Sequence, residues 1–274
     1  MRKYVLVLIV LFLLLRAFSV AQSSGFVDRA VDVGGKSYRY QVYVPRNWNK
    51  NQKWPVILFL HGAGERGSDG VKQTAVGLPQ AIRLNADKWP FIVVMPQCPE
   101  ELWWTQPEQE EQALKALDAA IAEFKGDPAR VYLTGLSMGG YGTLDIAARN
   151  PERFAALAPV CGGVVIEQRP ERQLPDWGPE PYKAVAQKIG KTPVWLFHGD
   201  LDDSVPVRES REMFKALQAA GGNVRYTEYP GVKHDSWNNA YWVPEYRSGC
   251  CRIRRRSERR TGLRHFAGGT PALL

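Results

Sequence analysis

The sequence predicts an α/β domain, with a mostly parallel, twisted sheet and helices on both faces. Four short runs, at 55–60, 91–95, 130–134 and 193–197, are largely apolar, as is typical of parallel strands buried on both sides. Amphipathic stretches separate these runs, and this alternation of strand and helix favours a sheet wrapped by helices. The length of 274 residues suits one large domain of this kind.

A hairpin is predicted at the start of this domain, over 31–45. Gly34 and Gly35 supply the turn, and apolar residues then recur at every second position. These positions are Tyr38, Tyr40, Val42 and Val44. Residues 154–160 and 224–229 are two further candidate strands.

Helices are predicted where apolar residues recur every three or four positions. One such stripe consists of Leu114, Leu117, Ile121 and Phe124. A second consists of Met213, Phe214 and Leu217. A third helix is expected over 141–149, because Asn150-Pro151 ends the segment.

Residues 1–21 are predicted to be a secretory signal peptide. Arg2 and Lys3 precede an apolar run, and small residues occupy the positions that a signal peptidase reads before position 22. The alternative is a membrane anchor, but the run is short for a span of about 20 residues, and Arg16 interrupts it. We therefore expect a secreted or periplasmic protein without a stable membrane anchor after cleavage, and a catalytic domain over 22–242.

The net charge of +8 is carried by the two ends of the chain. Three cations lie within 1–21, and the stretch from 241 onward holds eight arginines against two glutamates. The central domain has no basic surplus, so a nucleic-acid partner is not expected. Residues 243–274 form an atypical Arg-rich tail with no apolar period. It resembles a shifted reading frame or a replaced terminus; the alternative is a basic tail that binds anionic surfaces.

The chain has four cysteines, of which Cys250 and Cys251 lie in the tail. Cys98 and Cys161 each follow a predicted strand. An exported protein can oxidise such a pair. The sequence leaves open whether they form a disulfide or remain two buried thiols.

The strongest chemical signal is Gly135-Leu136-Ser137-Met138-Gly139, which matches the G-x-S-x-G nucleophile elbow. A serine on a sharp turn from strand to helix needs small neighbours, and both flanks have the expected pattern. The helix that follows also places positive partial charge near the serine. Ser137 is therefore the candidate nucleophile.

A serine nucleophile needs a base, and the base needs an orienting carboxylate. His234 follows the last predicted strand and is the candidate base, whereas His61 is expected to brace its loop. The acid precedes the histidine in this arrangement. The loop 199–206 follows a strand, at the carboxyl edge of the sheet where ligands bind, and offers Asp200, Asp202 and Asp203; of these three we favour Asp202.

An oxyanion formed during ester hydrolysis needs hydrogen-bond donors. The backbone N–H of Met138, next to the nucleophile, is one candidate. The second is expected from the loop Gly62-Ala63-Gly64, where we favour the N–H of Ala63.

Six ordered motifs resemble the α/β-hydrolase esterases often labelled predicted peptidases. They include Leu-His-Gly-Ala-Gly-Glu-Arg-Gly (60–67), Pro-Gln-Cys-Pro (96–99) and Phe-His-Gly-Asp (197–200). The resemblance covers about 35–242 and extends to phospholipase/carboxylesterase, feruloyl-esterase and polyhydroxybutyrate-depolymerase-like groups. It implies the α/β-hydrolase fold and a carboxylesterase with the triad Ser137, Asp202 and His234, without a cofactor or metal. A serine peptidase and a non-catalytic binding module on the same fold are the alternatives.

The substrate is less closely specified. Gln97, Trp103 and Trp104 follow a central strand near the expected site, and Trp237 follows His234. Aromatic residues in a cleft suit a sugar or phenolic ring, so these four are candidate substrate-binding residues; the alternative is that they pack the loops. We expect a small ester, or an ester on a polysaccharide or short polyester. The oligomeric state stays open.

Overall fold

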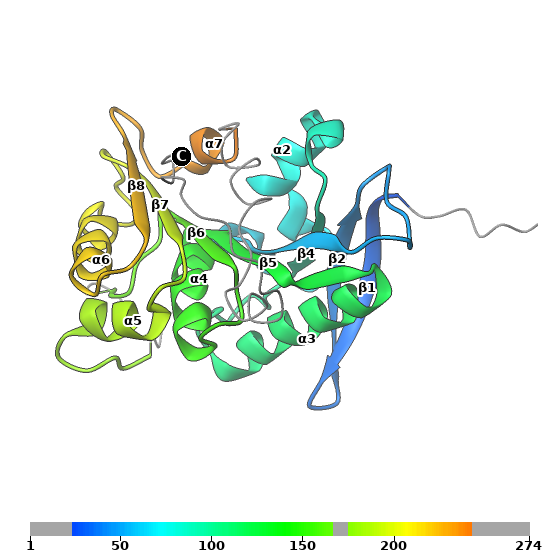
Figure 1. The fold of residues 1–274 in the computed structure, drawn as a ribbon, viewed down its shortest axis with the longest axis horizontal. Coiled ribbons are helices and arrows are strands. Elements are labelled where there is room, and N and C mark those ends of the chain that lie inside the picture. Colours follow the sequence, from blue (N-terminus) through cyan, green and yellow to red (C-terminus); the bar gives the residue numbers. More distant parts are fainter. Residues whose placement is uncertain (1–23, 167–174, 243–274) are drawn as a thin grey trace, which may run out of the picture.

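The structure is a computed structural model that describes residues 24–166 and 175–242. The predicted signal peptide (1–21), the Arg-rich tail (243–274) and the cysteines within that tail lie outside the described residues. The described part is built on an eight-stranded sheet in the order β1-β2-β4-β3-β5-β6-β7-β8 (Figure 1). The strands are β1 (Gly25–Val33), β2 (Lys36–Val44), β3 (Trp54–Leu60), β4 (Ile92–Pro96), β5 (Gly126–Leu136), β6 (Ala156–Val160), β7 (Val194–Gly199) and β8 (Val224–Tyr229).

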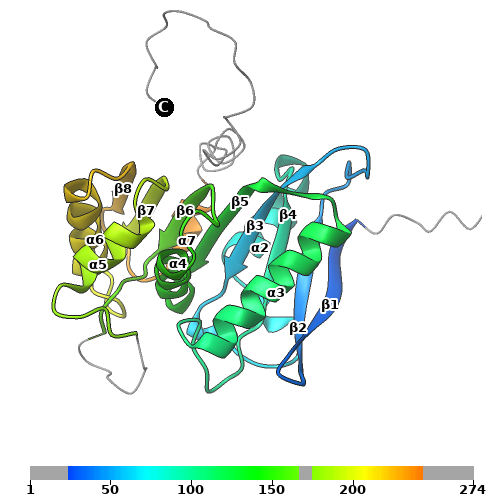
Figure 2. The ribbon, with the colours of Figure 1, turned by 60° about the horizontal axis from the view of Figure 1, so that its bottom comes forward.

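Helices cover both faces of this sheet. Strands β3 to β8 run parallel, and β1 and β2 extend the sheet in antiparallel pairing. Helices α3, α4, α5 and α6 lie on one face, and α2 and α7 on the other (Figures 1 and 2). The helices are α2 (Leu78–Leu84), α3 (Pro107–Glu123), α4 (Met138–Arg149), α5 (Pro181–Ile189), α6 (Arg208–Ala219) and α7 (Trp237–Ala240). The predicted α/β-hydrolase fold class is confirmed.

The predicted hairpin is present, and its first strand is longer than the sequence indicated. Pairing runs from Gly25 opposite Val44 to Val33 opposite Lys36. The two residues of the turn have positive φ angles of 59° and 80°, which glycine adopts at little cost. Such a turn matches the twist of the strands that it joins.

The core follows the alternation of side chains along the strands. All seven residues of β3 are buried. Val56 and Leu58 face the layer of α3 to α6, and Ile57 and Phe59 face the layer of α2 and α7. A strand buried on both faces explains why the sequence shows a continuous apolar run here.

The sheet order decides between the two alternatives for Cys98 and Cys161. Both are buried free thiols. Cys98 follows β4 and Cys161 follows β6, with β3 and β5 between these strands. Three inter-strand steps of about 4.8 Å exceed the separation that a disulfide can bridge. The two side chains also belong to opposite layers of the core.

Within the described residues, every helix is too short or too polar to cross a lipid bilayer. The predicted amphipathic helices correspond to α3 and α6. In α3, Leu117 is fully buried, and Phe124 directly after the helix is almost so. In α6, Met213 and Leu217 are fully buried, and Phe214 packs against the edge of the same core.

Candidate active site

Ser137 lies on a sharp turn between β5 and α4. Its φ of 52° is unusual for a residue with a side chain, and its amide donates a hydrogen bond to the carbonyl of Val160 (3.0 Å). A Cβ at Gly139 would lie 2.0 Å from the carbonyl oxygen of Leu60, and a Cβ at Gly135 would lie 2.3 Å from that of Gly139. Only glycine fits at both positions, which is the physical basis of the motif.

The helix after Ser137 begins earlier than the predicted 141–149. The amides of Gly140 and Tyr141 donate to the carbonyl of Ser137 at 2.8 and 3.1 Å, so α4 starts at Met138. The serine therefore sits at the N-terminus of a 12-residue helix, whose unpaired amides carry partial positive charge.

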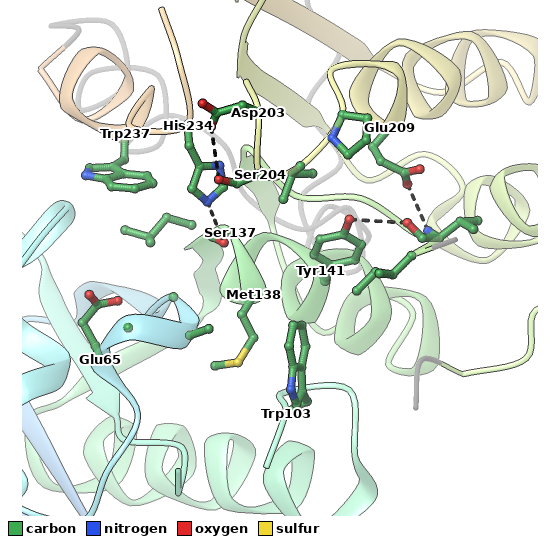
Figure 3. A pocket seen from close by; sticks show the side chains of 18 of the residues that line it. Glu65, Trp103, Ser137, Met138, Tyr141, Asp203, Ser204, Glu209, His234 and Trp237 are labelled. Atoms are coloured by element: carbon green, nitrogen blue, oxygen red, sulfur yellow. Dashed lines mark hydrogen bonds between the residues drawn. The ribbon is translucent and has the colours of Figure 1, made fainter. Parts of the chain in front are cut away.

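A hydrogen-bonded chain joins Ser137, His234 and Asp202 (Figure 3). The Nε2 atom of His234 lies 2.9 Å from the Ser137 hydroxyl, and its Nδ1 atom lies 2.8 Å from Oδ2 of Asp202. A carboxylate can only accept, so Nδ1 carries the proton and Nε2 accepts from the serine. This is the protonation state in which an imidazole can take a proton from a hydroxyl.

The carboxylate of Asp202 receives four hydrogen bonds. The amides of Ser204 and Val205 donate to Oδ1 at 2.9 and 2.8 Å. Oδ2 accepts from His234, and Nε2 of His198 lies 3.2 Å from the same oxygen. Burial raises the pKa of Asp202, but the bonds from the two histidines and Val205 outweigh it and hold that pKa well below the usual range. Asp202 therefore stays ionised.

The two other aspartates of this loop point elsewhere. Asp200 accepts a hydrogen bond from the amide of Gly231 (2.7 Å). Asp203 is exposed and faces Lys233 at 3.8 Å. The structure thus brings Asp202, and neither of its neighbours, to His234.

An open pocket of about 500 Å³ surrounds the serine, a size that accommodates a small organic ligand. Ala63 and Met138, the candidate oxyanion donors, both line it. Trp103 and Trp237 line it as well, and the ring of Trp237 lies edge-on to His234 with centroids 5.4 Å apart.

Trp104 and Gln97 do not line the pocket, which corrects the expectation for these two residues. Trp104 is fully buried, and its indole N–H donates to the carbonyl of His61 (3.0 Å). The Gln97 side chain accepts from the amide of Gly70 (2.6 Å) and donates to the carbonyl of Glu65 (3.3 Å). Both side chains turn into the protein and brace the loops around the site.

His61 braces its loop, as expected from the sequence. Its Nε2 atom accepts from the amide of Cys98 (2.9 Å), and Nδ1 lies 2.6 Å from the carbonyl of Gly62. Burial lowers the pKa of His61 to about 4, so the ring is neutral at physiological pH.

Several residues at the site were missed by sequence reasoning. Glu65, Tyr141 and Glu209 line the pocket, and His198 contacts Asp202 from within the core. Glu65 belongs to the motif at 60–67, which is a signal that could have found it. Glu209 lies on α6, a few residues after the loop 199–206 but outside every motif, and only the fold shows that it lines the pocket.

One cluster in the described ranges has metal-ligating atoms close together. Atoms of Cys161, Asp202 and His234 lie within 4.8 Å of one another. The imidazole and the carboxylate already bond to each other, and burial raises the pKa of the Cys161 thiol far above neutral pH. The hydrogen bond between the imidazole and the carboxylate suits these two groups to proton transfer.

The fold and this site together define the class: the protein is a serine hydrolase of the α/β-hydrolase type. A family model for the prolyl oligopeptidase family matches residues 104–248. The chain belongs to the prolyl oligopeptidase family.

Relatives of this chain include both esterases and peptidases. It is similar to a thermostable esterase of known structure, with 31% identity and a TM-score of 0.70, covering 84% of this chain and 63% of that one. It is 26% identical to feruloyl esterase B of Thermothelomyces thermophilus in an alignment of 251 positions that covers 81% of each chain. Dipeptidyl-peptidase 5 of Porphyromonas gingivalis is 25% identical over 224 residues. That match is 70% of this chain, which spans 32% of the peptidase.

Proposed function

We propose that this protein is a secreted serine carboxylesterase that hydrolyses short-chain, aryl or carbohydrate-linked esters through an acyl-enzyme. The observation that carries the proposal is the hydrogen-bonded chain Ser137–His234–Asp202 at the wall of an open pocket. Secretion rests on the leader sequence at 1–21.

The chemistry is acyl transfer in two steps. The Ser137 oxygen attacks the ester carbonyl, and Nε2 of His234 takes the hydroxyl proton. Asp202 holds the imidazole and stabilises its cation, while the amides of Ala63 and Met138 stabilise the oxyanion. His234 then gives the proton to the departing alcohol, and the acyl group is left on Ser137.

Water completes the cycle by the same route. His234 takes a proton from the water as its oxygen attacks the acyl-enzyme carbonyl, and the proton returns to the Ser137 oxygen as the bond to the acyl group breaks. The products are the free acid and the regenerated enzyme. No cofactor or metal takes part in these steps.

Two observations favour an ester over a peptide as the substrate. The match to feruloyl esterase B covers 81% of both chains, whereas the chain spans only 32% of dipeptidyl-peptidase 5. The solved structure at 31% identity is also an esterase. The proposal covers acetyl and feruloyl esters on polysaccharides, and short polyesters, as substrates.

A serine peptidase is the second candidate, and the family match over 104–248 favours it. The same triad can cleave an amide once a peptide is bound. Cleavage of a blocked peptide amide, with no turnover of aryl esters, would identify this alternative. A non-catalytic binding module is less well supported because the three side chains form an unbroken hydrogen-bonded chain.

The test compares the wild type with Ser137→Ala on p-nitrophenyl acetate, butyrate and octanoate. We expect turnover by the wild type and a loss of about 10³-fold or more in kcat for the variant. Ser68→Ala is the matched control, since Ser68 is exposed and does not line the pocket. If circular dichroism shows folded wild type that hydrolyses none of the three esters, the esterase assignment is wrong.

A further inference from the structure

The pocket extends to two sides of Ser137 (Figure 3). Tyr141 and Glu209 lie on one side, where the Tyr141 hydroxyl donates to the carbonyl of Val165 (3.4 Å). Trp237 and Glu65 lie on the other side. We call the side formed by Trp237 and Glu65 the alcohol side.

The position of His234 shows which side faces the leaving alcohol. In the proposed reaction, Nε2 of His234 gives its proton to the alcohol oxygen, so that oxygen must lie beside the imidazole. Trp237 contacts this imidazole with its ring at 85° to it. A substrate group attached to the alcohol oxygen can therefore pack against Trp237.

Glu65 brings a carboxylate close to the nucleophile. A Cβ placed on Gly62 would lie 3.1 Å from Oε2 of Glu65 and 3.6 Å from Cβ of Ser137, so both groups border the same point. Across residues 24–166 and 175–242, the side chain of Glu65 forms no ion pair. Burial raises its pKa, with the amides of Gly62 and of Glu65 itself opposing that effect.

A carboxylate at this place has a cost for the proposed reaction. An ionised Glu65 repels the negative charge that develops on the substrate oxygen in the oxyanion site. The acyl-transfer steps make no use of it. The amides of Gly62 and Glu65 already donate to this carboxylate, and a substrate group that also donates a hydrogen bond to it would offset the repulsion.

We propose that Glu65 and Trp237 form the binding site for a sugar as the alcohol part of the substrate. A hydroxyl group next to the ester oxygen donates to the Glu65 carboxylate, and the apolar face of the sugar ring packs on the indole of Trp237. An aromatic surface beside a hydrogen-bond acceptor matches the two kinds of surface that a sugar presents. This inference rests on the proposed esterase function and narrows its substrate class.

The first experiment compares two acetate esters that differ only in the alcohol, p-nitrophenyl acetate and an acetylated methyl β-xyloside. We measure the ratio of kcat/KM for the sugar ester to kcat/KM for the aryl ester. Glu65→Ala should lower this ratio about tenfold, and Glu65→Gln, which keeps the shape and one acceptor oxygen, should lower it less. Glu101→Gln is the control, since Glu101 is exposed outside the pocket.

The second experiment measures binding without turnover. Methyl β-xyloside is titrated into Ser137→Ala protein by calorimetry, with and without Glu65→Gln. We expect millimolar binding that weakens several-fold when Glu65 is replaced. Equal affinity with and without the carboxylate, or no binding at all, would overturn the sugar site, as would a parallel loss on both esters in the first experiment.

The two experiments separate this inference from the proposed function. Aryl-ester turnover without xyloside binding would leave the esterase standing and remove the sugar site. Xyloside binding that depends on Glu65, in a protein that hydrolyses no ester, would support the sugar site and remove the esterase.

Discussion

Replacing Asp202 by asparagine tests whether this carboxylate sets the protonation of His234. The Asn oxygen can still accept from the amides of Ser204 and Val205, as Oδ1 does now. Its NH₂ group would then face Nδ1 of His234, where the carboxylate oxygen lies at 2.8 Å. Two donors cannot pair, so the imidazole would lose its Nδ1 proton and hold one on Nε2 instead. An Nε2–H cannot accept the proton of Ser137.

The expected loss follows from two terms. Restoring the active protonation state leaves an unpaired donor, and the cation formed in the transition state loses a charge-assisted hydrogen bond. Together these cost about 3 to 6 kcal/mol, which corresponds to roughly 10²- to 10⁴-fold in kcat. KM should change little, because Asp202 does not line the pocket.

The assay is steady-state hydrolysis of p-nitrophenyl acetate, with Asp200→Asn as the control. Asp200 was one of the two alternative acids in the sequence, and its Oδ1 atom accepts from the amide of Gly231. The control should keep its rate within a few-fold. If Asp202→Asn retains more than a tenth of kcat while circular dichroism shows the native fold, the reasoning about Nδ1 is wrong.

Three further predictions concern stability and the pocket wall. His61 has a folded-state pKa of about 4 against an ordinary value of 6.5. As the pH falls, His61 of the unfolded chain therefore takes up a proton before His61 of the folded chain does. About 3 kcal/mol of stability is lost between about pH 6.5 and about pH 4. Urea unfolding at pH 7 and pH 4.5 measures this loss of stability, and His61→Gln should reduce the dependence of stability on pH. A variant with the same dependence on pH as the wild type would contradict the prediction. Gly139→Ala should lower stability by about 3 kcal/mol or more, because its Cβ would meet the Leu60 carbonyl at 2.0 Å; a native melting temperature would refute this close packing. Glu209 accepts from the amides of Val164 and Val165 and from the Tyr182 hydroxyl. Glu209→Gln should therefore destabilise the protein by about 1 to 3 kcal/mol and raise KM for octanoate esters. A KM that stays constant would show that this pocket wall does not contact the acyl chain.

Much of the fold could be predicted because its signals are local. Apolar runs marked the strands of the parallel sheet, and β8 has the bounds that the pattern indicated, 224–229. Strand ends were less certain, since pairing with a neighbour extends a strand beyond its apolar part. β5 runs from Gly126 to Leu136, well past the predicted 130–134, because Gly126 pairs with Trp54 of β3 and residues 131–136 pair with β3 and β6.

The serine and the histidine of the hydrogen-bonded chain were also visible in the sequence as candidate nucleophile and base. Ser137 is flanked by glycines that its own turn requires, and His234 follows the last strand. The acid was harder, because three aspartates lie within four residues. The amides of Ser204 and Val205 hold one oxygen of Asp202, and the other oxygen contacts His234. The contact also depends on the loop after β8, because that loop carries His234.

The sequence by itself determined where the strands and three of the helices lie along the chain, the sharp turn at Ser137 and the residue types of a serine hydrolase. These features depend on neighbours within a few positions along the chain. Only the tertiary structure decided that Trp104 and Gln97 turn inward, that Cys98 and Cys161 lie apart, and that Glu65 lines the pocket around Ser137. A side chain in a loop takes its direction from packing against distant segments, and that packing exists only once the sheet has formed.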